Sequence, residues 1–223
     1  MSGRKSRAKT TELRVVFDTN ILHNESANEL VRQEVAQLLA DNASHEDLTF
    51  SWLIPDTVRL ERRYQMRERA RALLPAIRKM ERLLSLNLNI TEAIIEERVD
   101  SHITTQMATI GLTPLPLDTT AVDWSRVLHD AASRVAPFER GEKEKGFRDL
   151  LVGEAFIQLA TSSPITAKLC RVILVSGDEQ LRDMVVRRVG DKENVKLFVN
   201  IEEAPRFHKY TRIECHRGLC KQI

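Results

Sequence analysis

The sequence predicts an α/β fold built on a parallel sheet. Short apolar runs alternate along the chain with segments whose apolar residues recur at helical spacing, and this alternation is typical of βαβ units. The runs carry few polar residues, as expected of strands that are covered on both faces. Four strands are expected, at residues 13–17 (LRVVF), 48–54 (LTFSWLI), 170–175 (CRVILV) and 195–199 (VKLFV).

The first expected helices follow the first two strands. Residues 27–40 repeat apolar side chains at helical spacing. A longer helix begins at Asp56, a residue type suited to an N-cap, and runs to about Leu74. Pro75 ends or kinks it, and the helical pattern then resumes to about Leu86.

The second half of the chain predicts further helices separated by loops. A helix over 91–107 opens with Thr91 and several acids, which suit a helix N-terminus. Gly111 and Pro114–Pro116 indicate a loop. Later helices are expected over 118–135, 147–161 and 179–188, with a charged loop over 137–146.

The expected organisation is one domain with an insertion. The chain has 223 residues, of which 42% are hydrophobic and 30% charged, so a packed core is expected. Residues 1–12 form a flexible basic tail, residues 13–205 a single domain, and residues 206–223 a basic C-terminal extension. Residues from about 65 to about 135 are expected to form an added helical layer. Trp52 and Trp124 are expected to pack in the core.

Composition excludes several classes of protein. The net charge of +2 does not mark a nucleic-acid binder, and 5% aromatic residues argue against binding of single strands mainly by base stacking. Three cysteines cannot form a full disulfide framework, which predicts a reducing compartment and hence a cytoplasmic protein. No apolar run approaches the ~20 residues of a membrane span, so no membrane partner is expected.

Acids follow the two clearest strands. LRVVF runs directly into Asp18, with Asn20 two residues later, and CRVILV runs into Ser176-Gly177-Asp178. Ligand sites of open α/β sheets lie beyond the carboxyl ends of the strands, so these side chains are expected to converge there. The alternative is that each acid only caps the helix that follows it.

Clustered carboxylates predict a site for a hard divalent cation. Neighbouring carboxylates raise one another's pKa, and Mg²⁺ or Mn²⁺, which prefer oxygen ligands, would relieve that conflict. Further acids that could join the cluster are Glu61, Asp149, Glu154 and Asp183.

Four segments together resemble the PIN-domain nucleases, in particular the larger bacterial PIN-like proteins. They are VVFDTNIL, IPDTVRLERR, FRDLLVGEA and VSGDEQLRD. The resemblance implies a three-layer sandwich with a central parallel sheet. It also implies that Asp18, Glu61, Asp149 and Asp178 are the catalytic acids, with Asn20 and Ser176 supporting them. Glu68 is an alternative to Glu61 in its charged helix.

The resemblance implies a metal-dependent ribonuclease, with RNA favoured over DNA as the substrate. Asp18, Asp149 and Asp178 would hold Mg²⁺ or Mn²⁺, with Glu61 and Asp183 as further candidate ligands. Water activated by the metal would hydrolyse the phosphodiester without a covalent intermediate. Family members often pair as dimers, so a homodimer through the helical middle is a candidate, as is a regulatory or antitoxin-like protein partner.

Basic residues near the second acid predict contacts with phosphates. Nine Arg and Lys residues lie between Arg59 and Arg82 against three acids, which leaves an excess of +6. Too few acids lie in this stretch to pair with them, and nucleic-acid phosphates are the expected partners. The residues expected to bind phosphate are Arg59, Arg62, Arg63, Lys145 and Arg148.

Two other enzyme or binding functions fit part of the pattern. In a phosphatase of the haloacid-dehalogenase type, Asp18 would be the nucleophile, but Asn20 stands where that family commonly has an acid. A non-catalytic PIN-like RNA-binding module is the other alternative. A zinc site at Cys215, His216 and Cys220, with His208, fits no finger spacing and is not favoured.

Overall fold

The computed structural model describes residues 11–23, 28–45, 48–138 and 145–203. The expected basic tail to residue 10, the C-terminal extension and the zinc candidates therefore lie outside the described residues.

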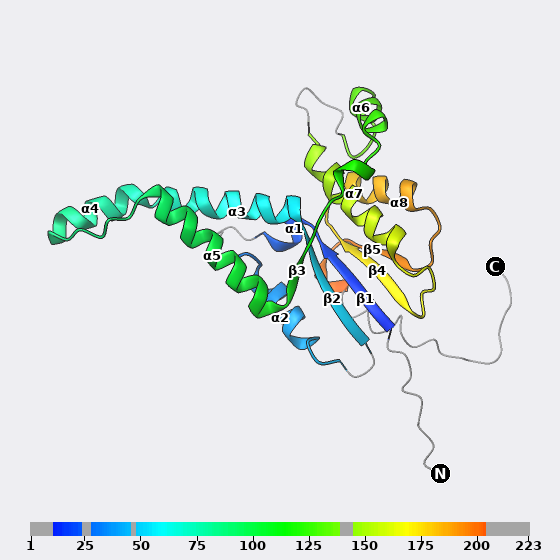
Figure 1. Cartoon of the computed structure of the whole chain (residues 1–223), viewed down its shortest axis with the longest axis horizontal. Coiled ribbons are helices and arrows are strands. Elements are labelled where there is room, and N and C mark those ends of the chain that lie inside the picture. Colours follow the sequence, from blue (N-terminus) through cyan, green and yellow to red (C-terminus); the bar gives the residue numbers. More distant parts are fainter. Residues whose placement is uncertain (1–10, 24–27, 46–47, 139–144, 204–223) are drawn as a thin grey trace, which may run out of the picture.

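Five parallel strands form the centre of the fold (Figure 1). They are β1 (Thr11–Phe17), β2 (Leu48–Pro55), β3 (Leu112–Leu115), β4 (Cys170–Val175) and β5 (Val195–Phe198), in the order β3-β2-β1-β4-β5. The predicted α/β class is confirmed. The apolar residues of β1 and β4 are buried because helices cover both faces of the sheet, which explains their apolar runs, whereas Thr11, Glu12 and Arg14 of β1 are half-buried.

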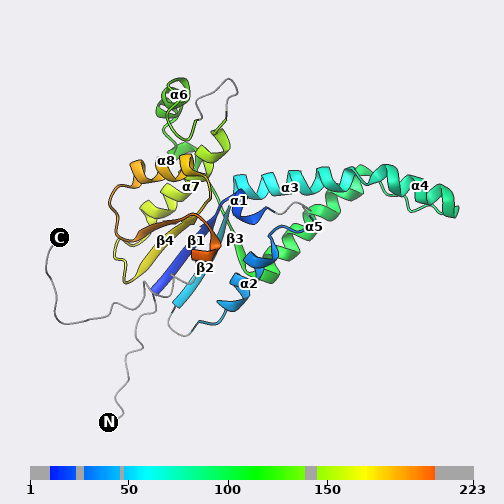
Figure 2. The ribbon, with the colours of Figure 1, turned by 180° about the vertical axis from the view of Figure 1, so that it is seen from behind.

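The helices lie on both sides of the sheet. The α-helices are α1 (Thr19–Leu22), α2 (Gln33–Asp41), α3 (Asp56–Arg71), α4 (Leu74–Leu84), α5 (Glu92–Ile110), α6 (Trp124–Ala132), α7 (Phe147–Ser162) and α8 (Glu179–Val189). Two 3₁₀ turns, η1 (Thr119–Ala121) and η2 (Ile201–Glu203), complete the described elements. α7 and α8 pack together on one side, and α2 and α5 lie on the other (Figures 1 and 2).

The order of the strands places a crevice between β1 and β4. The chain passes from β1 to β2 and β3 in one direction, and then returns to β4 and β5 on the other side of β1. Connections therefore leave the carboxyl ends of β1 and β4 toward opposite faces. This reversal is the topological switch point at which α/β sheets bind ligands.

Four expectations about local structure are wrong. Residues 112–115 form the edge strand β3 and not a loop, because the missing N–H of Pro114 costs no ladder bond on the outer side of an edge strand. The helix expected from residue 27 begins at Gln33. The helix expected over 118–135 spans only Trp124–Ala132, after the 3₁₀ turn η1. Trp124 is 41% exposed, with its indole N–H donating to the Thr119 carbonyl, whereas Trp52 is buried as expected.

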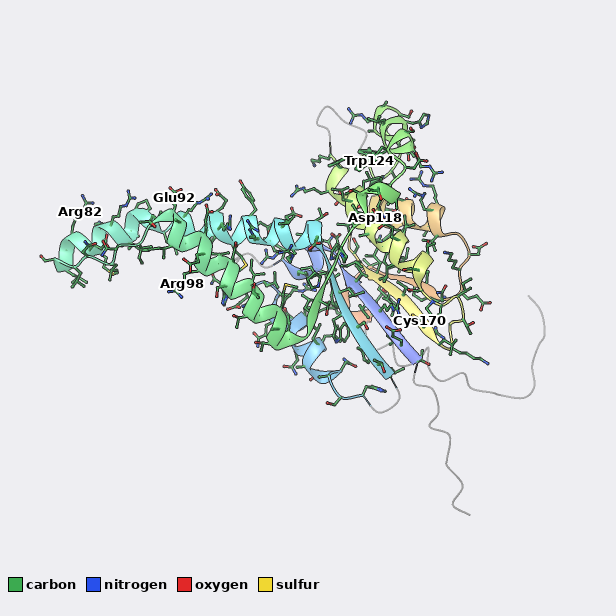
Figure 3. The ribbon with its side chains drawn as sticks, viewed as in Figure 1. Arg82, Glu92, Arg98, Asp118, Trp124 and Cys170 are labelled. Carbon is green, nitrogen blue, oxygen red and sulfur yellow. The ribbon has the colours of Figure 1, made fainter. Side chains whose placement is uncertain are left out.

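α3, α4 and α5 form a helical arm that extends away from the sheet (Figures 1 and 2). α3 and α5 run side by side, and α4 continues beyond them. Figure 3 places Arg82 toward the far end of the arm and Glu92 where the chain turns back into α5. The segment predicted as an added helical layer thus contains the distal helices of this arm and also the sheet strand β3.

Candidate active site at the carboxyl ends of the strands

Asp18 lies at the switch point and is held there by the backbone. It follows β1 directly, and its N–H donates to the Val175 carbonyl of β4 at 3.1 Å. Its Oδ1 accepts from the Thr19 N–H at 2.6 Å, so it also caps the short helix α1. The side chain is only 3% exposed. Capping and membership of the site are therefore compatible roles for this residue.

A hydrogen-bond network joins Asp18 to the end of β4. Oδ2 of Asp18 accepts from the Ser176 hydroxyl at 2.6 Å and from the Asn20 amide at 2.8 Å. The Asn20 Oδ1 accepts from the Gly177 N–H at 3.0 Å, and Ser176 Oγ accepts from the Asp178 N–H at 3.0 Å. The two supporting residues predicted from the sequence thus tie the acidic ends of β1 and β4 together.

Asp178 is the N-cap of α8. Its Oδ1 accepts from the Leu181 N–H at 2.8 Å. The capping role considered from the sequence is therefore real, yet its charge still reaches the site, because it contributes to the raised pKa of both Asp18 and Asp149.

Glu61 reaches the same site from the first half of α3. Its Oε2 accepts from the Thr19 hydroxyl at 2.8 Å, and its Oε1 forms an ion pair with Arg148 of α7. The alternative, Glu68, is exposed and pairs with Arg71 farther along α3. Glu61 is thus the acid of this helix that lies beside Asp18.

Asp149 faces these acids from the first turn of α7. A cavity of about 560 Å³ is lined by Asp18, Thr19, Asn20, His23, Glu61, Gln65, Lys145, Gly146, Phe147, Arg148, Asp149 and Val152. Burial raises the pKa of Asp149 to about 6, with further contributions from the charges of Asp178, Asp18 and Glu61, while Arg148 opposes them. Three carboxylates from three segments therefore line the cavity, and Asp178, which is not among its lining residues, adds its charge from the end of β4.

The electrostatics of this cluster fit a hard divalent cation. Burial raises the pKa of Asp18, the charges of Asp178 and Glu61 raise it further, and hydrogen bonds from Ser176 and Thr19 oppose the rise. Carboxylates held in mutual repulsion are the donor set that Mg²⁺ and Mn²⁺ prefer. In the described part of the chain, no group of three or more His, Cys, Asp or Glu side chains is already arranged to hold a metal ion. Glu61 instead forms an ion pair with Arg148, and Asp178 caps the N-terminus of α8.

Two further candidate acids lie apart from this cavity. Glu154 is 3% exposed, and both of its oxygens accept from Arg188 of α8 at 2.6 and 3.3 Å. Asp183 is exposed on α8 and does not line the cavity. Each lies about one and a half helical turns after a cluster acid, so its side chain leaves the helix in another direction.

The five residues predicted to bind phosphate lie in three different environments. Lys145 and Arg148 line the cavity. Arg59 pairs with Asp56, and Arg63 with Asp100 of α5. Arg62 is completely buried and donates to the Glu29 and Leu30 carbonyls, so its prediction as a surface phosphate contact is wrong.

The excess of basic residues in α3 is balanced by acids from another helix. Arg67 pairs with Glu96 and Asp100, and Arg71 with Glu92, Glu96 and Glu68. Most of these acids lie on α5, outside residues 59–82. The expectation that these cations lack protein partners is therefore wrong for this part of the arm.

Three polar side chains of the cavity were missed by sequence reasoning. Thr19 donates to Glu61, while His23 and Gln65 lie together at the wall. Thr19 stands inside the motif that singled out Asp18 and Asn20, so its position was a usable signal. His23 and Gln65 belong to no motif, and only the fold brings them to the acids.

Comparison with known proteins identifies the family. A family model described as PIN domain matches residues 15–181, which is most of the chain and includes all four clustered acids. No curated protein and no solved structure matches the chain. In the described residues, no helix has the length and apolar character needed to span a membrane. PIN domains are generally nucleases that use divalent metals. The five-stranded parallel sheet and the match agree, and the chain belongs to the PIN domain family.

Proposed function

We propose that the protein is a metal-dependent phosphodiester hydrolase that cleaves nucleic acid, with RNA as the favoured substrate. One observation carries this proposal: the carboxylates of Asp18, Glu61 and Asp149, from three separate segments, line one cavity. Their mutual repulsion, together with the nearby charge of Asp178, contributes to the raised pKa of Asp18 and Asp149. A protein gains nothing in stability from such a cluster, whereas a bound cation turns it into a strong ligand set.

Asp18, Asp149 and Asp178 are the proposed metal ligands, with Glu61 as a fourth. A bound Mg²⁺ or Mn²⁺ would supply charge neutralisation at the phosphate and a lowered pKa for an attacking water. The chain's own contribution is orientation. Ser176 and Asn20 both donate to Oδ2 of Asp18, which fixes the carboxylate plane, and such supporting contacts typically change metal affinity 10- to 100-fold.

Arg148 is the proposed phosphate contact nearest the acids. Its side chain is 67% exposed, so it can leave Glu61 and turn toward a substrate phosphate. Lys145, at the same rim, would add a second positive charge. Arg62 has no part in this contact, because its guanidinium lies in the interior.

The phosphatase alternative loses its support. The family match is to PIN domains. In addition, both Asp18 oxygens already accept hydrogen bonds, and Asn20 uses its amide to join Asp18 to Gly177. In that mechanism the residue two positions after the nucleophile transfers a proton as general acid, and the amide of Asn20 cannot do so. The non-catalytic RNA-binding module is retained as an outcome of the test. The homodimer, the antitoxin-like partner and the cytoplasmic location stay predictions.

The test compares the parent protein with Asp18→Asn. With Mn²⁺, the parent should cleave single-stranded RNA, whereas Asp18→Asn should lose at least about 100-fold in rate, because several kcal/mol of transition-state stabilisation depend on the metal. Mn²⁺ should raise the melting temperature of the parent and barely change that of the variant, since binding at 100 times Kd adds about 2.7 kcal/mol.

The control is Asp183→Asn, which changes an exposed acid outside the cavity and should leave cleavage unchanged. Matched RNA and DNA oligomers test the preferred substrate. Mn²⁺-dependent stabilisation without cleavage of any oligomer would instead favour the binding module. An Asp18→Asn protein that cleaves like the parent would remove the proposal.

A further inference from the structure

The buried side chain of Arg62 holds two residues of the cavity wall, His23 and Gln65, in place. It lies in α3 directly after Glu61, and its side chain is completely buried. Its Nε donates to the Leu30 carbonyl at 3.1 Å and its Nη2 to the Glu29 carbonyl at 2.7 Å. The guanidinium is planar, so these two bonds to backbone fix its orientation and with it the direction in which Nη1 points.

Nη1 of Arg62 points at His23. The distance from Nη1 to Nδ1 of the imidazole is 2.9 Å, and the same Nη1 donates to Oε1 of Gln65. A guanidinium can only donate hydrogen bonds. Nδ1 of His23 must therefore be the acceptor, and the ring proton lies on Nε2. The separation of 3.3 Å between Nδ1 and the Gln65 oxygen is then a contact between two acceptors of the same donor.

The imidazole is therefore presented as a neutral hydrogen-bond donor. His23 is exposed and lines the same cavity as Asp18, Glu61 and Asp149. Within the described residues, its Nε2 has no hydrogen-bond partner. The ring follows α1, whose N-cap is Asp18, so the acid and the imidazole lie at opposite ends of one helical turn.

We propose that His23 is a substrate-binding residue whose Nε2–H donates to a non-bridging phosphate oxygen of the nucleic-acid strand next to the carboxylate cluster. This inference rests on the proposed function. Phosphodiester oxygens are acceptors that recur along a strand whatever its sequence, and a neutral donor holds one without adding charge to the site. Arg62 is the positioning residue, because it fixes which nitrogen of His23 carries the proton.

A neutral contact has a distinctive salt dependence. Each Lys or Arg that binds phosphate releases counterions and steepens the fall of log K with log salt by about 0.7 for a single strand. Loss of a neutral donor lowers the affinity but leaves this slope unchanged. The slope therefore separates the role proposed for His23 from that of a cationic contact such as Lys145.

Two substitutions divide the functions of the two ring nitrogens. The amide of His23→Asn can place its oxygen near the position of Nδ1, which keeps the acceptor for Arg62 and removes the outer donor. The longer amide of His23→Gln can place an N–H near the position of Nε2. His129→Asn is the matched control, because His129 is an exposed histidine on α6 outside the cavity.

Binding is measured with the full chain carrying Asp18→Asn, which blocks cleavage, and a fluorescent single-stranded RNA over a series of salt concentrations without divalent metal. His23→Asn should weaken binding by about 3- to 10-fold with an unchanged salt slope, as expected for one neutral hydrogen bond. His23→Gln should recover most of the loss, and His129→Asn should bind like its parent. Lys145→Gln should reduce the slope instead.

Histidine ¹⁵N spectra of the parent test the tautomer without any substrate. The His23 signals, assigned by their loss in His23→Asn, should show the proton on Nε2. A proton on Nδ1, or unchanged affinity in a folded His23→Asn, would overturn the inference even if the parent cleaves RNA. Equal losses in the Asn and Gln variants would also overturn it. If the parent neither binds nor cleaves nucleic acid, the proposed function fails and this inference fails with it.

Discussion

The carboxyl of Asp149 makes the fold less stable at neutral pH than in mild acid. Its pKa rises from 3.8 to about 6 in the folded protein. For an acid with a raised folded pKa, the protonated form favours folding, so this contribution is present below about pH 4 and is lost as pH rises through about 6. Asp149→Asn cannot ionise and should therefore be more stable than the parent at pH 7 without metal.

The expected gain is about 1–2 kcal/mol at pH 7, after allowance for solvent screening of a partly exposed group. It should shrink toward zero at pH 4. Thermal unfolding of both proteins in a metal chelator, at pH 4 to 7, measures the difference. Asp183→Asn serves as the control, because this exposed acid lies outside the cavity. A parent that gains stability over the variant as pH rises would contradict the prediction.

Arg62 shows what the sequence could not predict about single residues. It stands among nine basic residues in a charge-rich stretch, where its neighbours are exposed or paired at the surface. The burial of one arginine depends on backbone carbonyls at residues 29 and 30, far from it in sequence. Asp18, Asn20 and Ser176 were predictable because each follows a strand, so that the strand itself fixes its position.

At the scale of elements, the start of α7 depends on Gly146. This residue has φ +102, which side chains rarely adopt, and a Cβ there would lie 2.3 Å from the Pro137 carbonyl oxygen. The neighbour is backbone and cannot yield as a flexible side chain can. Gly146 immediately precedes α7, whose first turn carries Arg148 and Asp149.

Gly146→Ala should therefore lower the free energy of unfolding by about 2–4 kcal/mol, through the strained φ and the backbone overlap together. Gly111→Ala is the matched control: φ is +69, but nothing lies within 4 Å of the added Cβ, so about 1 kcal/mol is expected. Denaturant unfolding measures both values. Equal costs would show that α7 can shift to accept the methyl group.

The elements also show where sequence patterns no longer predict the structure. β1, β4 and α7 were predictable because their apolar residues are numerous and regular. β3 has four residues and contains a proline, so its sequence is typical of a loop. Only its pairing with β2 makes it a strand, and that pairing is a property of the whole sheet.

At the scale of the whole molecule, the distal arm is set apart from the domain that carries the site. We define the distal arm as residues 73–90. Many of its large apolar side chains are 44–75% exposed; they are Leu73, Met80, Leu83, Leu84, Leu86 and Leu88. The base of the arm differs, because Val58 and Met66 of α3 belong to the hydrophobic core.

The ends of the distal arm lie close together. Arg71, the last residue of α3, has its Nε 4.0 Å from Oε2 of Glu92, the first residue of α5, and it also pairs with Glu96. A loop of two to five residues is the usual length for joining two antiparallel helices. A linker of about four Gly and Ser residues can therefore replace residues 73–90 while Thr91 is kept to cap α5.

This excision should leave the melting temperature within a few degrees of the parent and Mn²⁺ affinity unchanged, because few core contacts and none of the site residues are removed. Binding of an apolar dye should fall, since the exposed leucines are gone. Met66→Ala should instead cost about 2–5 kcal/mol, because Met66 is only 4% exposed at the base of the same arm. A shortened protein that fails to fold, beside a stable Met66→Ala variant, would mean that the distal arm and not its base stabilises the domain.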